Sequence, residues 1–352
     1  MVQVNRLNFP MPKYWLVSDR NNGGIGTERN VAGLSYFVSD TEPLTDINNW
    51  TKVSPTQFRT LLKAAADAFP ALTQAQNEDQ SHVTILIHGF NVSFQSSTGF
   101  YQDVCGRLFA GDQSLGLCIL YDWPSLGTVV GYEPDRAHAR ECAEDLTNIL
   151  SELYDWLLKQ QQVAIKFKGD PQKACKAKVS VIAHSMGNYL LQKAMAAAWT
   201  RKNQPLLTTL INQLVMAAAD VDNNLFDAGA PDNDDGGAMV NLIYRITTLF
   251  SGRDAVLSAS AGLKHFGARR LGRSGLATRP PLVTVLPQTD NVWDVDCTGF
   301  FPSDKVSAVD VHGAYFNTPE TIELIRQILR GIDRGVLNQS GVAGAANVPG
   351  SA

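Results

Sequence analysis

The chain has 352 residues, of which 44% are hydrophobic and 18% are charged, a balance typical of a globular protein with a large core. Its net charge of −4 argues against nucleic acid or an anionic membrane surface as the main partner. The five cysteines show no CxxC spacing, so the sequence predicts neither a zinc site nor a redox motif, and it favours a reduced setting. Because we find no signal peptide and no apolar run long enough to span a bilayer, we expect a cytoplasmic protein without a transmembrane segment.

Short apolar runs alternate with amphipathic segments along the chain. The apolar runs predict strands at 14–17, 34–38, 82–87, 117–121, 178–182, 210–218, 244–250, 282–286 and 292–295. The amphipathic segments predict helices at 56–69, 94–109, 135–161, 187–202 and 318–330. This alternation predicts an α/β fold with a mostly parallel, doubly wound sheet and helices on both of its faces.

Length alone suggests about two domains, but α/β folds often run this long as one unit. We expect residues 13–336 to form it, after an N-terminal extension at 1–12. Residues 337–352 are small and polar, so we expect a disordered tail there.

Two stretches within the domain look like local insertions, at 223–240 and 258–290. The first begins with a polar run rich in Asp and Gly, and 223–237 is expected to be a loop. The second contains the basic segment 264–273, which is expected to be a solvated part of the surface.

The most informative segment is Ala-His-Ser-Met-Gly at 183–187, which lies directly between a predicted strand and a predicted helix. A serine at such a turn is the nucleophile elbow of the α/β-hydrolase fold, because the turn raises its hydroxyl above the sheet. Ala183 stands where the strict motif has glycine, but it is still small. Of the serines with glycine two places later, only Ser185 also has Ala or Gly two places earlier. We therefore predict that Ser185 is a nucleophile.

A serine nucleophile needs a base, and in this fold the base follows the serine and the acid in the chain. Only His265 and His312 come after Ser185. His312 follows the last predicted strands and precedes the last helix, whereas no strand precedes His265. We favour His312 as the base.

Three carboxylates follow predicted strands and could orient that base. Asp254 ends the strand nearest in sequence to His312, which is the usual position of the acid, so we favour it. Asp220 and Asp222 end the preceding strand and remain the alternative.

An oxyanion hole requires two backbone N–H groups. We assign one to Met186, the residue after the nucleophile, and the other to Phe90 in the loop His88-Gly89-Phe90-Asn91. His88 precedes the serine in the chain, so a structural role is expected for it. Candidate substrate-binding residues are Asn91, Trp123 and Tyr315.

Further motifs accompany the elbow along the chain. They are Ser18-Asp19-Arg20, His88-Gly89-Phe90-Asn91, Trp123-Pro124-Ser125, Ser251-Gly252-Arg253-Asp254 and His312-Gly313-Ala314-Tyr315. Together with 183–188 they resemble a bacterial α/β-hydrolase family of unknown function. The resemblance implies a triad of Ser185, Asp254 and His312, and it supplies no substrate.

These residues predict a serine hydrolase that cleaves small-molecule carboxylic esters through an acyl-enzyme, without a metal or an organic cofactor. Short to medium acyl chains are expected, because no large apolar lid is evident in the sequence. The same triad could serve an amidase, a thioesterase or an acyltransferase, and a binding protein without activity is a further alternative. The sequence leaves the oligomeric state open.

Overall fold

The computed structural model describes residues 11–69, 81–128, 131–166, 177–199, 209–263, 265, 267–278, 291–332 and 337. The strand predicted at 282–286 lies outside these residues, as do nearly all of the predicted N-terminal extension and tail.

The described residues build a nine-stranded sheet with the order β3-β2-β1-β5-β4-β6-β7-β8-β9. Its strands are β1 (Tyr14–Ser18), β2 (Ser35–Ser39), β3 (Thr51–Val53), β4 (His82–Ile87), β5 (Gly116–Asp122), β6 (Lys178–His184), β7 (Ile211–Ala217), β8 (Ile243–Phe250) and β9 (Val292–Asp296). β2 pairs antiparallel with β1 and β3, and every other ladder is parallel. This is the mostly parallel sheet that the alternating pattern predicted.

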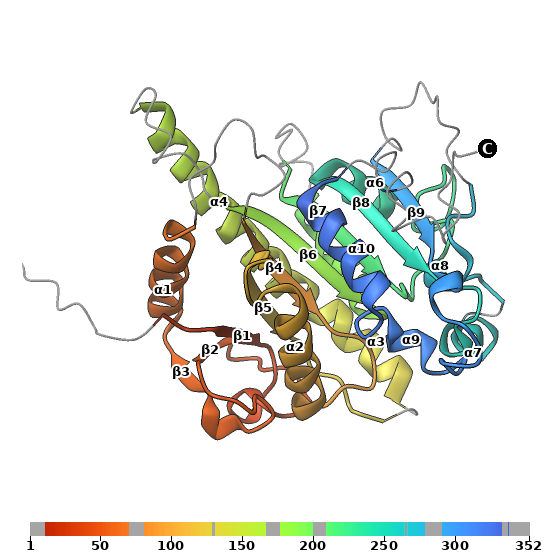
Figure 1. Ribbon diagram of the computed structural model, residues 1–352, viewed down its shortest axis with the longest axis horizontal. Coiled ribbons are helices and arrows are strands. Elements are labelled where there is room, and N and C mark those ends of the chain that lie inside the picture. The colour runs from red at the N-terminus through yellow and green to blue at the C-terminus, as the bar shows by residue number, and fades with distance from the viewer. Residues whose placement is uncertain are drawn as a thin grey trace, which may run out of the picture.

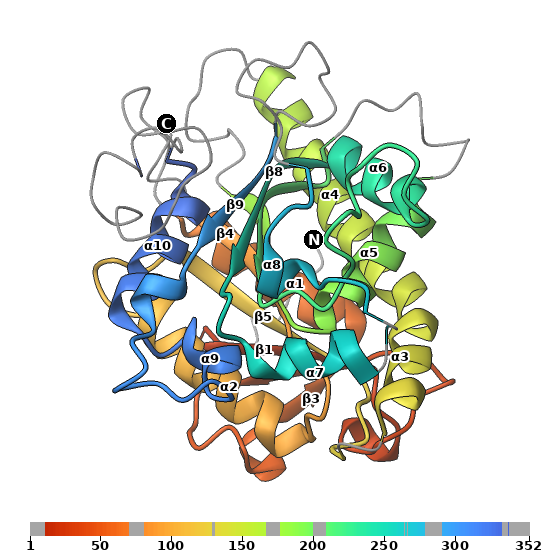
Figure 2. The same cartoon turned by 90° about the vertical axis from the view of Figure 1, so that its right-hand side faces the viewer.

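The helices cover both faces of the sheet (Figures 1 and 2). They are α1 (Pro55–Asp67), α2 (Phe94–Leu108), α3 (Tyr132–Glu141), α4 (Ala143–Lys166), α5 (Gly187–Ala198), α6 (Asn233–Leu242), α7 (Ala255–Leu263), α8 (Leu271–Ser274), α9 (Val311–Ala314) and α10 (Pro319–Arg330). In Figure 2, α3 to α6 lie on one side of the sheet, and α2, α9 and α10 lie on the other.

Each face of the sheet has its own hydrophobic core, because successive residues of a strand point to opposite sides. In β4, for example, Val83, Ile85 and Ile87 pack with α4 and α5, whereas Leu86 packs with α2 and α10. β6 lies between β4 and β7 near the middle of the sheet, so it is buried on both faces. The turn that follows β6 therefore starts from a rigid position.

Two predicted elements differ from the structure. The single helix predicted at 135–161 is two helices, α3 and α4, which meet at Cys142, and the first of them starts earlier, at Tyr132. The loop predicted at 223–237 ends at Asn233, where α6 begins. Asp234 and Asp235 lie in the first turn of α6, where the helix dipole favours carboxylates. The acidic residues of this stretch therefore indicated the start of a helix rather than a loop.

Burial of His82 predicts a loss of stability in acid. This side chain is 1% exposed, its Nδ1 lies 2.7 Å from Ser180 Oγ, and burial, with a smaller contribution from Lys178, lowers its pKa to about 3. The unfolded chain takes up the proton near pH 6.5, whereas the folded chain does not, so stability is complete above about pH 6.5 and declines as the pH falls from there toward 3. We expect this histidine to lower the free energy of unfolding by on the order of 2 kcal/mol between pH 7 and pH 5.

Urea unfolding of His82→Gln at several pH values checks this. The variant should lose less stability than the wild type between pH 7 and pH 5. An identical pH dependence in His82→Gln and the wild type would contradict the assignment.

Candidate active site

Ser185 occupies a sharp turn between β6 and α5. Its backbone is left-handed, with φ at 53°, a conformation that non-glycine residues rarely adopt and that clusters at functional sites. The turn is held by hydrogen bonds from Ser185 N to Ala217 O at 3.1 Å and from Asn188 N to Ser185 O at 3.1 Å. The Asn188 side chain adds a bond to Ala183 O at 3.0 Å. These bonds hold the serine in its uncommon conformation.

The loop after β4 packs directly against this turn, and only glycine fits at two positions of contact. A methyl group at Gly89 would lie 2.7 Å from Ser185 Cβ, and one at Gly187 would lie 2.5 Å from His88 O. Both distances are below normal van der Waals contact. The two glycines therefore bring the backbone of the 88–91 loop beside the serine.

The structure brings together the three residues that the sequence singled out. His312, in α9, has Nε2 2.9 Å from Ser185 Oγ and Nδ1 2.8 Å from Asp254 Oδ2. Asp254 follows β8 and is fully buried, whereas Ser185 is 5% exposed. The Asp254 carboxylate can only accept a hydrogen bond, so His312 Nδ1 is the donor. The proton of a neutral His312 therefore lies on Nδ1, and the lone pair of Nε2 faces the serine hydroxyl.

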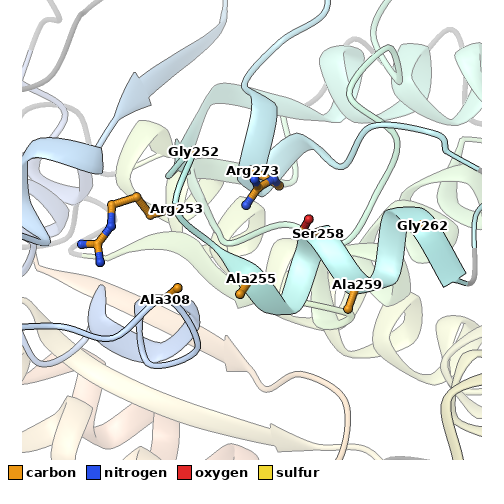
Figure 3. Close-up of a pocket in the computed structure, with 8 residues that line it drawn as sticks. All are labelled: Gly252, Arg253, Ala255, Ser258, Ala259, Gly262, Arg273 and Ala308. Carbon is orange, nitrogen blue, oxygen red and sulfur yellow. The ribbon is translucent and has the colours of Figure 1, made fainter. Parts of the chain in front are cut away.

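Hydrogen bonds hold both the side chain and the backbone carbonyl of Asp254. Its Oδ1 accepts a hydrogen bond from Leu257 N at 2.9 Å, so it caps α7, and its carbonyl accepts one from Arg273 Nη1 at 2.5 Å. The residues beside it line an open pocket of about 680 Å³ over α7 (Figure 3). In Figure 3 the side chain of Arg253 turns away from Arg273 and Ser258, and its guanidinium binds the carbonyls of Phe301 and Val306. Hydrogen bonds from Arg253 and Arg273 thus hold in place the loop that carries the Asp254 carboxylate.

The alternative acids belong to a separate cluster. Asp220 accepts hydrogen bonds from Arg270 Nε at 2.8 Å and from Tyr132 OH at 2.8 Å, and Asp222 pairs with the same arginine. Burial opposes ionisation of Asp220, but the Arg270 charge and the hydrogen bonds from Tyr132 and Ser260 together hold the pKa of this carboxyl below its usual value. The alternative base, His265, has Nε2 2.5 Å from Tyr132 OH. None of these groups contacts His312 or the Ser185 hydroxyl.

The same cluster shows that the prediction of a solvated surface segment at 264–273 is wrong for Arg270. Arg270 is 1% exposed and lies beneath the surface, where it joins the segment to the end of β7. Arg269 beside it is exposed, as predicted for the whole stretch. A buried arginine is stable there because two carboxylates and the carbonyl of Asp220 accept its N–H groups.

The two N–H groups predicted for the oxyanion hole belong to the two segments that meet at the serine, the turn after β6 and the loop after β4. Met186 directly follows Ser185 and precedes α5, and Phe90 follows Gly89, which touches Ser185. Neither N–H donates a backbone hydrogen bond within the part of the chain that the structure describes. Both are therefore available to an acceptor beside the serine.

A buried network holds the Phe90 loop from below. Arg20, at the end of β1, binds Asp122 Oδ2 at 2.8 Å and the carbonyl of Val92 at 2.8 Å. His88 Nε2 lies 2.9 Å from Asp122 Oδ1. Burial alone would raise the pKa of Asp122, but Arg20 and, to a smaller degree, His88 keep it below its usual value. Motifs from three strand ends thus meet in one network, and His88 has the structural position that we expected.

The predicted substrate-binding residues divide into two groups. Trp123 and Tyr315 are fully buried, so in this structure neither side chain presents a surface to a substrate. Trp123 stacks on His88 and donates from Nε1 to its carbonyl at 2.9 Å, and Tyr315 packs edge-on against Phe301. Asn91 is exposed and has a left-handed backbone with φ at 60°. Phe90 is partly buried and packs against the Tyr132 ring.

Comparison with known proteins assigns the chain to a family with this fold. The family model described as "Alpha/beta hydrolase of unknown function (DUF900)" matches residues 65–327, a segment that includes every site residue described above except Arg20. The chain belongs to this family.

A solved structure, "The crystal structure of the putative cell surface hydrolase from Lactobacillus plantarum WCFS1", aligns with 76% of this α/β-hydrolase and 99% of its own chain. Its sequence identity is 9% and its TM-score is 0.38. The curated proteins include no match.

Within the described part of this α/β-hydrolase, no group of three or more His, Cys, Asp or Glu side chains is arranged to hold a metal ion. No helix there is long and apolar enough to cross a bilayer.

Sequence reasoning missed His184, which precedes the serine. Its Nε2 lies 2.9 Å from the carbonyl oxygen of His312, and its ring packs against Phe100 and Phe316. The histidine is visible in the elbow motif, but these partners are far away in the sequence, so no local signal could have revealed the contact.

Proposed function

We propose that this α/β-hydrolase is a serine esterase that cleaves small carboxylic esters through an acyl-enzyme. The observation that carries the proposal is the continuous chain of contacts from Ser185 Oγ to His312 at 2.9 Å and from His312 to Asp254 at 2.8 Å. A serine hydroxyl is a weak nucleophile, and this arrangement supplies both the base that activates it and the carboxylate that orients the base.

In the first half of the reaction, Ser185 Oγ attacks the ester carbonyl while His312 Nε2 accepts its proton. The carbonyl electron pair moves to oxygen, and the oxyanion is stabilised by the N–H groups of Phe90 and Met186. The oxyanion then collapses, the bond to the alcohol oxygen breaks, and His312 donates its proton to that oxygen. The alcohol leaves, and the acyl group remains on Ser185.

In the second half, a water molecule takes the place of the alcohol. His312 Nε2 accepts a proton from the water as its oxygen attacks the acyl carbon, and the same two N–H groups hold the second oxyanion. Collapse releases the carboxylic acid, and Ser185 regains its proton from His312. Asp254 stays ionised throughout and stabilises the imidazolium that forms in each half.

Hydrolysis of p-nitrophenyl esters with acyl chains of two to sixteen carbons tests the proposal. We expect activity that is highest on short to medium chains. In Asp254→Asn, kcat should fall about 10³–10⁴-fold, because an amide donates to Nδ1 and turns the Nε2 proton toward the serine. Asp222→Asn is the matched control and should keep near-wild-type activity.

The panel also separates the proposal from its relatives. Cleavage of p-nitroanilides or thioesters in preference to oxygen esters would assign the same triad to an amidase or a thioesterase. Loss of activity in Asp222→Asn, with Asp254→Asn unaffected, would contradict the assignment of the acid.

A further inference from the structure

His184 lies between the serine turn and the loop that carries His312. It is the last residue of β6 and directly precedes Ser185. Its ring centroid lies 4.9 Å from that of His312, 5.6 Å from that of Phe316 and 6.1 Å from that of Phe100. The His184 ring therefore packs against two aromatic side chains as well as against the His312 ring.

The polar contact of this ring is with the backbone of His312. His184 Nε2 lies 2.9 Å from the His312 carbonyl oxygen. A carbonyl can only accept, so the proton of His184 is on Nε2 and the histidine is the donor. Burial first, and the neighbouring His312 second, lower the pKa of His184 to about 3, so the ring is neutral at any pH at which an esterase is assayed.

The segment that His184 holds has little structure of its own. α9 spans only Val311–Ala314, which is a single turn, and His312 lies within it. In so short a helix few carbonyls find a partner inside the helix. His312 contacts two adjacent residues at the end of β6, through its carbonyl to His184 and through its ring to Ser185. The hydrogen bond from His184 therefore fixes the His312 backbone at a set distance from the serine turn.

The neutral state of His184 also matters for the chemistry. His312 becomes an imidazolium in each half of the proposed reaction, and a second positive ring 4.9 Å away would oppose that charge. Enclosure by Phe100 and Phe316 keeps His184 uncharged, so it holds the base without lowering the base's affinity for a proton.

We propose that His184 is a positioning residue, which holds His312 against Ser185 through its hydrogen bond to the His312 carbonyl. The proposal rests on the proposed function, since it assigns His184 a part in setting the geometry of that triad. A misplacement of about 1 Å in a catalytic group can lower the rate about 10²-fold.

A matched pair of variants tests it. In His184→Gln the amide nitrogen takes the place of Nε2 and can still reach the His312 carbonyl, whereas in His184→Asn it takes the place of Nδ1 and cannot. We expect kcat for p-nitrophenyl esters to fall about 10- to 100-fold in the Asn variant with KM little changed, and to stay within about 3-fold of wild type in the Gln variant. Thermal unfolding identifies any variant that is not folded.

Proton NMR of the His312 Nδ1–H gives a second readout that needs no turnover. This proton, shared with Asp254, should give a sharp downfield signal in the wild type and in His184→Gln, and a weakened or shifted one in His184→Asn. The signal is assigned by its absence in His312→Gln. Equal signals and equal kcat in the two His184 variants would overturn the positioning role. If the signal differs between the two His184 variants in this way but the wild-type protein cleaves no ester, the proposed function is overturned and the positioning role is kept.

Discussion

Ser185→Ala is expected to lower kcat for ester hydrolysis about 10⁴–10⁶-fold while the protein stays folded. In the proposed mechanism the Ser185 hydroxyl is the group that attacks the ester, and His312 alone cannot form the acyl-enzyme. The side chain is small and the turn is held by backbone bonds and Asn188, so the melting temperature should change little. Steady-state kinetics and thermal unfolding of the same preparation measure both quantities.

Ser260 provides the matched control. It also has glycine two places later in the sequence, and its hydroxyl binds Asp220 Oδ1 at 2.9 Å. Ser260→Ala should retain the activity of the wild type. Undiminished activity in Ser185→Ala would show that the nucleophile has been misassigned.

Arg270→Leu is expected to lower the free energy of unfolding by about 3–5 kcal/mol. The side chain is fully buried, and its removal leaves the buried carboxylate of Asp220 without a compensating charge. Burial then raises the pKa of Asp220 in the folded variant above its unfolded value. The penalty should therefore be largest at high pH and shrink as the pH falls and the carboxyl takes up a proton. Urea unfolding at pH 8 and pH 5 measures it.

Two further variants sharpen that experiment. Arg269→Leu removes a neighbouring arginine that is exposed, and it should change stability by less than about 0.5 kcal/mol. Adding Asp220→Asn to Arg270→Leu removes the stranded charge and should restore part of the loss. Equal effects of Arg269→Leu and Arg270→Leu would mean that 264–273 is the solvated segment that the sequence suggested.

Much of the fold and of the candidate site followed from local sequence patterns. β4, β6 and β7 are short apolar runs bounded by polar residues, so their positions were predictable to within about one or two residues. Ser185 was identifiable because a strand, a small-residue turn and a helix are contiguous. His312 followed from chain order, since only two histidines come after the serine.

The choice between acids needed the structure. Asp220 and Asp254 both follow parallel strands, and the sequence favoured Asp254 only because its strand is nearer in sequence to His312. Only the folded chain shows that the Asp220 carboxylate binds Arg270, which is some fifty positions away in the sequence. The carboxylate that contacts His312 is that of Asp254. The long-range pairing of Arg270 also explains why a stretch that looks basic and solvated contains a buried side chain.

Aromatic residues near motifs were also ambiguous. Trp123 and Phe90 both belong to motifs at strand ends, and large aromatic side chains are suited both to pockets and to cores. Trp123 proves to be a platform beneath His88, whereas Phe90 is partly open. Their exposure depends on partners from other strands, which pattern alone does not reveal.

Mass-spectrometric mapping of a fluorophosphonate adduct tests the central claim most directly, because the probe reacts with an activated serine whatever the natural substrate. The account predicts one adduct, on Ser185 in the native protein, with labelling abolished by heat denaturation and strongly slowed in His312→Ala. An adduct on another serine such as Ser260, or no adduct on Ser185 of the native protein, would contradict it.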